Sequence, residues 1–268
     1  MRNLLCLSLP LALAAGLANA ATYTVNFDSP GYTADADPGF AGVDGWSQLP
    51  ANNPPDPGPP VEYAPYAWIG ASFSTGNAAA YGGFYDSLPD GFTLSRDFTG
   101  LVAGQKSLSF QNHITDSDLF GGRDTFGFTI TDGGGDLLLT VNLVPASQDL
   151  GEEALWNVQY AFGSDSLALT GNARPANGVN FFSVDFGLTG LTFNYGGSSD
   201  NFSLSGTPAG YNASDTTLAL DFTYDQIGDG DNFVRIDNIN VVDAIPEPSA
   251  ALFAGIGGLA LVRRRRAR

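Results

Sequence analysis

Apolar residues alternate with polar ones in segment after segment of this chain. The clearest examples are 126–130, 182–188 and 218–224, where Phe, Leu, Val, Ile or Tyr occupies every second position. A period of two places one face of a strand in a core and the other in solvent. Clusters of Gly, Asn and Asp, such as the run at 132–135, separate these segments at hairpin spacing. The pattern predicts ten or more short antiparallel strands.

So many strands with one buried face each favour two sheets packed face to face. We therefore expect an all-β fold, an antiparallel, jelly-roll-like β-sandwich. The body, residues 21–244, is long enough for one such domain, and no linker divides it. One short helical turn is expected over 148–156. The proline-rich stretch 49–65 predicts an extended crossover between the sheets, with a binding loop as the alternative.

The first 20 residues predict a secretory signal peptide. Arg2 precedes an apolar core over 4–17, and Ala-Asn-Ala at 18–20 is a small-x-small cleavage site. Signal peptidase would therefore remove 1–20. The single cysteine, Cys6, lies inside this segment and too early for a lipoprotein signal, so the exported body has no thiol or disulfide chemistry.

The chain is strongly acidic, with 28 acidic and 11 basic residues and a net charge of -17. The two terminal segments hold six of the arginines and one glutamate, which leaves the body with 27 acidic and 5 basic residues. Such a surface repels nucleic acid and anionic membranes, so we expect no nucleic-acid partner. It suits either a solvated coat on a secreted protein or a surface that holds divalent cations.

The last 24 residues, 245–268, contain three parts in order. Pro246-Glu247-Pro248 ends the folded body, because prolines at this spacing fit neither a strand nor a helix interior. An uncharged apolar run over 250–262 predicts a short helix, below the roughly 20 residues that span a bilayer. A basic cluster then favours the cytoplasmic side of a membrane, and it comprises Arg263, Arg264, Arg265 and Arg266.

This order of features resembles the PEP-CTERM sorting signal of Gram-negative bacteria. The resemblance implies recognition of Pro-Glu-Pro by an exosortase, a membrane-embedded, transpeptidase-like enzyme that cleaves the tail. The body would then be released or attached at the cell surface, often in bacteria that make exopolysaccharide. A role in biofilm or exopolysaccharide is therefore expected. A simple C-terminal membrane anchor is the alternative.

The segment 233–242 predicts the last strand, with a β-bulge where the alternation slips near Asp237. This ending is similar to the last strand of many secreted jelly-roll modules, including carbohydrate-binding ones. The resemblance implies that the first and last strands lie side by side. It also implies a structural calcium near their junction, where Asp28 and Asp237 would be ligands.

Two further acidic groups offer the oxygen ligands that calcium prefers. One lies in a Gly-containing loop and comprises Asp225, Asp229, Asp231 and Asn232. The other comprises Asp116, Asp118 and Asp124. Neither group has EF-hand spacing, and Asp and Asn also form ordinary turns. Calcium is therefore a candidate cofactor, with turn formation as the alternative.

Exposed aromatic rings stack on sugars, and several aromatic residues lie in Gly-rich or Pro-rich segments. They are Trp46, Trp68, Tyr81 and Tyr85. We take Trp46 and Trp68 as candidate ligand contacts, with packing under loops as the alternative. Trp156 alternates with apolar neighbours, which predicts a place in the core.

Catalysis has little support in the sequence. The single histidine, His113, makes no zinc site of the usual kind, and no Gly-x-Ser-x-Gly elbow accompanies it. Many carboxylate pairs are available for glycoside hydrolysis, but no spacing singles one out. We therefore expect a non-enzymatic surface or matrix protein. A carbohydrate-binding module is the first alternative, and a secreted glycoside hydrolase is the second.

Overall fold

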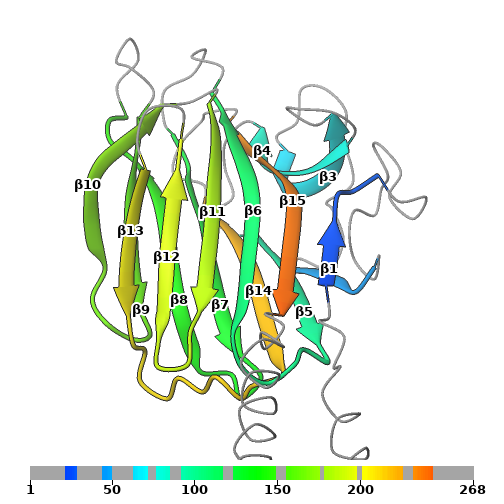
Figure 1. Cartoon of the computed structure of the whole chain (residues 1–268). Coiled ribbons are helices and arrows are strands. Elements are labelled where there is room, and N and C mark those ends of the chain that lie inside the picture. The colour runs from blue at the N-terminus through cyan, green and yellow to red at the C-terminus, as the bar shows by residue number, and fades with distance from the viewer. Residues whose placement is uncertain are drawn as a thin grey trace, which may run out of the picture.

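The computed structural model describes residues 22–28, 44–49, 63–71, 77–84, 92–116, 123–148, 155–175, 178–197, 201–225 and 232–243. These residues form fifteen strands in two antiparallel sheets that face each other, and none of them is helical (Figure 1). The expected all-β sandwich is confirmed. No helix in this part of the chain has the length and apolarity to cross a membrane. The predicted signal peptide and sorting signal lie outside the described residues.

Each sheet has its own strand order. The seven-stranded sheet runs β10 (Ala168–Pro175), β9 (Leu155–Phe162), β8 (Leu137–Pro145), β7 (Thr125–Asp132), β14 (Thr217–Asp225), β5 (Phe92–Thr99) and β2 (Trp46–Leu49). The eight-stranded sheet runs β13 (Asn201–Gly206), β12 (Leu191–Gly196), β11 (Val179–Phe186), β6 (Lys106–Thr115), β15 (Phe233–Asp243), β4 (Asn77–Phe84) and β3 (Tyr63–Ala71), with β1 (Thr22–Val25) also paired to β15.

The last strand, β15, pairs with the first strand, β1, so the two ends of the described chain meet in one sheet. One edge of β15 pairs with β6, whereas the other pairs first with β4 and then with β1. The first and last strands therefore lie side by side, as predicted (Figure 1). The register of β15 against β6 shifts between Asp237 and Asn240, and Asn238 has a φ of 53°. This is the predicted bulge.

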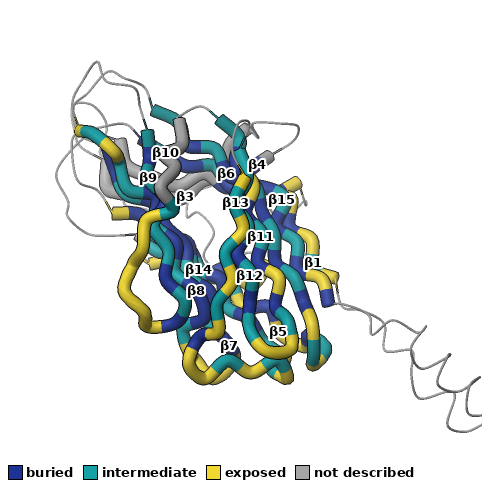
Figure 2. Tube along the Cα trace, turned by 60° about the vertical axis from the view of Figure 1, so that its left-hand side comes forward, coloured by how far each residue is buried: buried dark blue, intermediate teal, exposed yellow. Residues whose placement is uncertain are grey.

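Aromatic side chains fill the space between the sheets. The ring centroid of Phe110 on β6 lies 5.0 Å from that of Phe128 on β7 and 5.1 Å from that of Phe222 on β14. Burial alternates along the strands, so one face of each sheet contributes to this core (Figure 2). A fully buried Phe contributes about 1.5–3 kcal/mol relative to an exposed one, so these contacts bind the sheets firmly. Trp156 is fully buried, as predicted.

Some local expectations need correction or refinement. The helical turn predicted over 148–156 is wrong for its last two residues, which belong to β9, where Trp156 pairs with Pro145 of β8. Residues 149–154 lie outside the described part. Leu188 is exposed rather than buried, because β11 ends at Phe186 and the chain turns there. The proline-rich stretch joins β2 and β3, which lie in different sheets, as a crossover requires.

Candidate functional site

On five strands of the eight-stranded sheet, the outward side chains that the structure describes are mostly hydroxyls and amides. Alternation along β6, β11, β12, β13 and β15 turns every second residue away from the core. The outward polar residues include Ser107, Ser109, Gln111, Ser183, Thr192, Asn194, Asn201, Ser203, Ser205, Asn238 and Asn240. These hydroxyls and amides offer both hydrogen-bond donors and acceptors and carry no formal charge.

Two open hollows, of about 610 and 730 Å³, lie on this face. The first includes Ser109 and Ser183, and the second includes Ser107 and Asp185, which are the next outward residues on the same two strands. The hollows therefore lie end to end along the strands. We call them together the groove. Its lining on β11 runs from Phe181 to Phe186, about 17 Å at 3.3 Å per residue.

Hydrogen bonds fix the polar side chains of the groove. The side-chain amide of Asn194 donates to Ser183 Oγ at 3.2 Å and to Asp185 Oδ2 at 3.1 Å. The side-chain amide of Asn238 donates to Gln111 Oε1 at 3.2 Å. An amide group has two donor hydrogens and an acceptor oxygen, so capacity for a ligand remains. The side chains are thus held in place before any ligand arrives, which lowers the entropy lost on binding.

Phe181 on β11 is a large apolar side chain of this mostly polar surface, on which Val242 is also exposed. It is 52% exposed, lines the smaller hollow, and lies opposite Gln111 of β6 in the strand register. A flat apolar ring framed by amides and hydroxyls matches a sugar, whose ring carries C–H groups on its faces and hydroxyls on its edge. Sequence reasoning missed Phe181, although its position is out of phase with the buried alternation Phe182, Val184 and Phe186.

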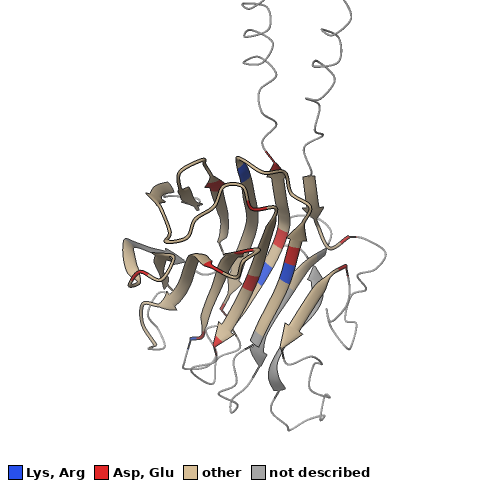
Figure 3. Cartoon of the chain, turned by 90° about the horizontal axis from the view of Figure 1, so that it is seen from below, with Lys and Arg blue, Asp and Glu red and all other residues tan. Residues whose placement is uncertain are grey.

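Charge is sparse along the groove although the protein is acidic. Among the residues that the structure describes, Figure 3 shows acidic residues mainly at strand ends and in loops, with fewer along the strands. Among the described residues that line the hollows, Asp185 is the one carboxylate. Glycoside hydrolysis needs a pair of carboxylates, and the described lining of the groove does not supply it.

The two candidate tryptophans were predicted to contact a ligand, and Trp46 does not fit that role. Trp46 is only 2% exposed because it begins β2 on the inward side. Its ring packs against Phe27 and Phe222, with the Arg96 guanidinium 5.6 Å from its centroid. The packing alternative therefore holds for Trp46, although its ring packs from strand β2 rather than under a loop. The side chain of Trp68 lies outside the described residues.

The predicted calcium ligands near the first and last strands have different surroundings. Asp28 is exposed, whereas Asp237 is 2% exposed and accepts a hydrogen bond from the Asn238 backbone N–H at 2.7 Å. Asp237 therefore stabilises the bulge. Asp229 and Asp231 lie outside the described residues. No group of three or more His, Cys, Asp or Glu side chains suited to a metal occurs in the described part, so calcium stays a prediction.

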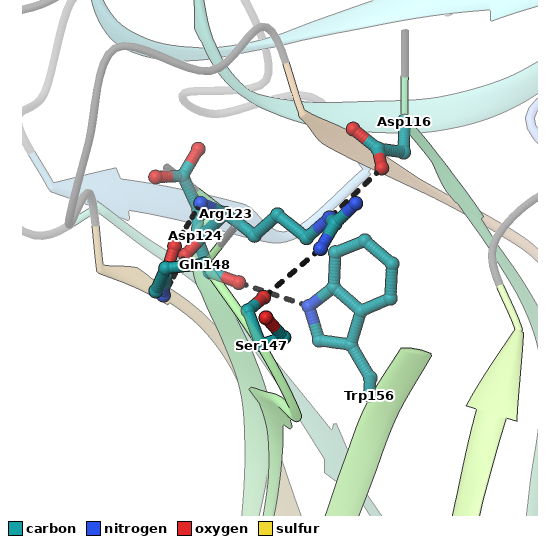
Figure 4. Close-up of polar contacts among 6 residues, drawn as sticks. All are labelled: Asp116, Arg123, Asp124, Ser147, Gln148 and Trp156. Atoms are coloured by element: carbon teal, nitrogen blue, oxygen red, sulfur yellow. Dashed lines mark hydrogen bonds and ion pairs between the residues drawn. The ribbon is translucent and has the colours of Figure 1, made fainter. Parts of the chain in front are cut away.

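Two members of the second acidic group belong to a buried network at one end of the sandwich (Figure 4). Arg123 Nε lies 3.0 Å from Asp116 Oδ2, and both side chains are almost fully buried. Asp124 accepts a hydrogen bond from Tyr224 Oη at 2.7 Å, and its backbone oxygen accepts one from Trp156 Nε1 at 3.0 Å. These carboxylates therefore have protein partners and join β6, β7, β9 and β14.

The same network holds the chain beyond β8. Arg123 Nη1 donates to the Ser147 carbonyl at 3.0 Å. The side chain of Gln148 accepts from the Arg123 backbone N–H and donates to the Arg123 carbonyl (Figure 4). No member of this network lines the groove, so its role is to fix the strand ends.

Comparison with known proteins identifies the fold. No family model and no curated protein matches this chain. The CBM2 module of the evolved Dit of Lactobacillus casei BL23 phage J-1 is 10% identical with a TM-score of 0.51, and the match covers 84% of this chain and 97% of that one. Lectin I from Ulex europaeus, solved with the methyl glycoside of α-L-fucose, is 9% identical with a TM-score of 0.51, covering 83% and 97%.

Peanut lectin, solved with a 9mer peptide, is similar to the same extent. It is 9% identical with a TM-score of 0.50, and the match covers 85% of this chain and all of that one. Identities this low show the fold alone. The chain therefore has the two-sheet sandwich found in these lectins and in the CBM2 module.

Proposed function

We propose that this protein is an exported, non-enzymatic carbohydrate-binding protein of the cell surface or extracellular matrix. The groove is its binding site. A sugar ring lies on Phe181, and its hydroxyls bond to the surrounding amides and hydroxyls. The observation that carries this proposal is the groove itself: two adjoining open hollows in which amides and hydroxyls surround a half-exposed aromatic ring, with one carboxylate among the described lining residues.

The chemistry of the groove supports a sugar over other ligands. Each sugar hydroxyl both donates and accepts hydrogen bonds, as do the side chains of Ser183, Asn194 and Gln111. An open groove along the strands accepts the interior of a long chain, whereas a closed pocket selects a terminal unit. The similar folds include lectins and a CBM2 module, which supports a carbohydrate ligand.

The terminal segments support a place for this binding outside the inner membrane. On the proposed route, signal peptidase removes 1–20, and an exosortase recognises Pro246-Glu247-Pro248 and removes the arginine cluster. The body then meets exopolysaccharide, which is the proposed ligand. Sorting thus brings the protein to the extracellular matrix, where the groove binds exopolysaccharide.

Matched variants on the two sheets test the binding site. Phe181→Ala and Asn194→Ala remove an apolar side chain and an amide from the groove. The controls Leu169→Ala and Asn157→Ala remove an apolar side chain and an amide from β10 and β9 of the other sheet. The purified proteins are measured by affinity electrophoresis and calorimetry against xylan, β-glucan, galactomannan, alginate and polygalacturonate. Loss of one good contact costs about 1–2 kcal/mol, so each groove variant should bind roughly 5- to 30-fold more weakly.

The control variants should bind like the wild type. Equal affinity for all four variants would remove the groove from the proposal. Absence of binding to any of these five polysaccharides, and to exopolysaccharide extracted from a producing strain, would refute the carbohydrate function. Thermal unfolding of each variant confirms that the comparison is made between folded proteins.

A further inference from the structure

Arg235, a cation on the groove face, differs from the other Lys and Arg residues whose side-chain contacts the structure describes. Arg96 pairs with Asp44, Arg123 pairs with Asp116, and Lys106 Nζ donates to backbone carbonyls. Arg235 on β15 forms no ion pair with the residues that the structure describes. Its guanidinium carbon lies 4.9 Å from the ring centroid of Phe233, its neighbour on the same outward face.

Arg235 lies where the groove ends. In the strand register it is opposite His113 of β6, which is opposite Val179 of β11. Gln111 and Phe181, the next outward residues on those strands, line the smaller hollow. Outward residues two positions apart are about 7 Å from each other, so Arg235 is within one sugar unit of the hollow.

The contact with Phe233 leaves the chemistry of Arg235 available. An aromatic ring attracts a guanidinium through the ring face, while the N–H donors lie in the plane of the guanidinium. Five such donors form a fork that matches a carboxylate in two parallel hydrogen bonds. The contact with the Phe233 ring thus holds the long side chain of Arg235 by its charge, and it requires none of the N–H donors.

We propose that Arg235 forms a carboxylate-binding subsite at this end of the groove, so that the ligand is an acidic polysaccharide bearing uronate or similar carboxylates. This inference rests on the proposed function and names its substrate class. The sugar next to the one on Phe181 carries the carboxylate. Asp185 lies six residues along the strand from the Arg235 row, about 20 Å away, so the two ends of the groove differ in charge.

The acidic character of the whole protein does not prevent this contact. Charges are screened over about 8 Å at physiological salt, so remote carboxylates act weakly on a ligand at Arg235. The net charge of -17 repels an acidic ligand at long range. Two charge-assisted hydrogen bonds between Arg235 and the ligand carboxylate supply a favourable binding free energy that offsets this repulsion.

The test compares polymers that differ only in the carboxylate. Polygalacturonate and alginate are compared with their methyl-esterified forms, and dextran sulfate reports on sulfate. The variants are Arg235→Gln and Arg235→Lys. The control, Gln159→Glu on β9, lowers the net charge by the same unit as Arg235→Gln but lies on the outer face of the other sheet. Thermal unfolding verifies that all are folded.

The wild type should prefer the acid form, and Arg235→Gln should weaken that binding about 10- to 100-fold while leaving the esterified form unchanged. Arg235→Lys should retain part of the affinity, and Gln159→Glu all of it. Equal binding of acid and ester would refute the subsite but leave the carbohydrate function intact. So would equal losses in Arg235→Gln and Gln159→Glu. A preference for dextran sulfate would reassign the subsite, and no binding to any polymer would refute both proposals.

Discussion

Replacing Arg123 by methionine isolates the contribution of one buried ion pair. Arg123 Nε lies 3.0 Å from Asp116 Oδ2, and the two side chains are 5% and 6% exposed. Arg123 Nη1 also donates to the Ser147 carbonyl at 3.0 Å. Methionine keeps most of the aliphatic stem but supplies no donor. Breaking a buried pair from one side costs about 3–5 kcal/mol, because the remaining charge has no partner.

Thermal unfolding followed by circular dichroism measures this cost. One kcal/mol shifts the Tm of a domain of this size by about 2–4 °C, so the Tm should fall by roughly 6–20 °C. The matched control is Arg96→Met. Its partner Asp44 is 53% exposed, and methionine keeps the stem against Trp46. An exposed pair contributes about 0–1 kcal/mol, so the control should lose less than about 4 °C.

A double variant separates the ion pair from its parts. Asp116→Asn combined with Arg123→Met removes both charges of the pair, so it should recover much of the Tm that Arg123→Met loses. The two hydrogen bonds of the Gln148 side chain go to the backbone of residue 123, so they can form in every variant. The reasoning is refuted if Arg123→Met melts like the Arg96→Met control, or if the losses of the single variants simply add in the double variant.

Three other measurements test separate parts of the structure. Gly206→Ala should lower the free energy of unfolding by about 1–3 kcal/mol, because an added Cβ would lie 2.3 Å from the Phe162 ring; an unchanged denaturation midpoint would contradict this packing. Burial lowers the pKa of Lys106, so the unfolded chain binds more protons than the folded one as the pH rises toward the ordinary lysine pKa of about 10.4. The stability of the wild type relative to Lys106→Met should therefore increase as the pH rises toward that value. A difference between the two proteins that does not change with pH would argue against this buried ammonium. The intact mass of the protein from its native host should begin at Ala21 and end near Pro246; a mass that retains the arginine cluster, found in the inner membrane, would indicate an ordinary anchor instead.

The strands were predictable because burial alternation is a local property. Phe182, Val184 and Phe186 are predicted to face inward, and all three are buried. The bulge at Asp237 is visible in the sequence as a slip of phase, and the structure has a register shift at that point. Local pattern therefore determines which face of each strand is buried, and even where a strand is irregular.

The groove was not predictable because it depends on strand order. Gln111 and Asn238 form a hydrogen bond although 127 residues separate them in the sequence. Phe181 and Asn194 join them only because β6, β11 and β12 are neighbours in the sheet. Alternation identifies outward residues but does not say which other strands lie beside them.

Two misassigned sites share another cause. In the sequence, the glycine before Trp46 suggests a loop around that residue. In the structure, Gly45 has a φ of 79° and lies in the turn before β2, and the ring of Trp46, the first residue of β2, faces inward. Asp124 belongs to an acidic group by sequence, but its carboxylate bonds to Tyr224, 100 residues away. Flanking composition describes the neighbours in sequence, whereas burial and pairing depend on neighbours in space.

The position of β15 has a consequence for how this protein reaches its folded state. The pairings of β15 with β1, β4 and β6 complete the eight-stranded sheet, and β15 is the last of the described strands. A chain delivered from its amino end, by a ribosome or through a translocation channel, therefore presents open strand edges until residue 243 has emerged. Such long-range pairing forms slowly, and open edges invite wrong partners. Completion of synthesis or passage, rather than collapse of the first strands, is thus the step that commits the sandwich to its native order.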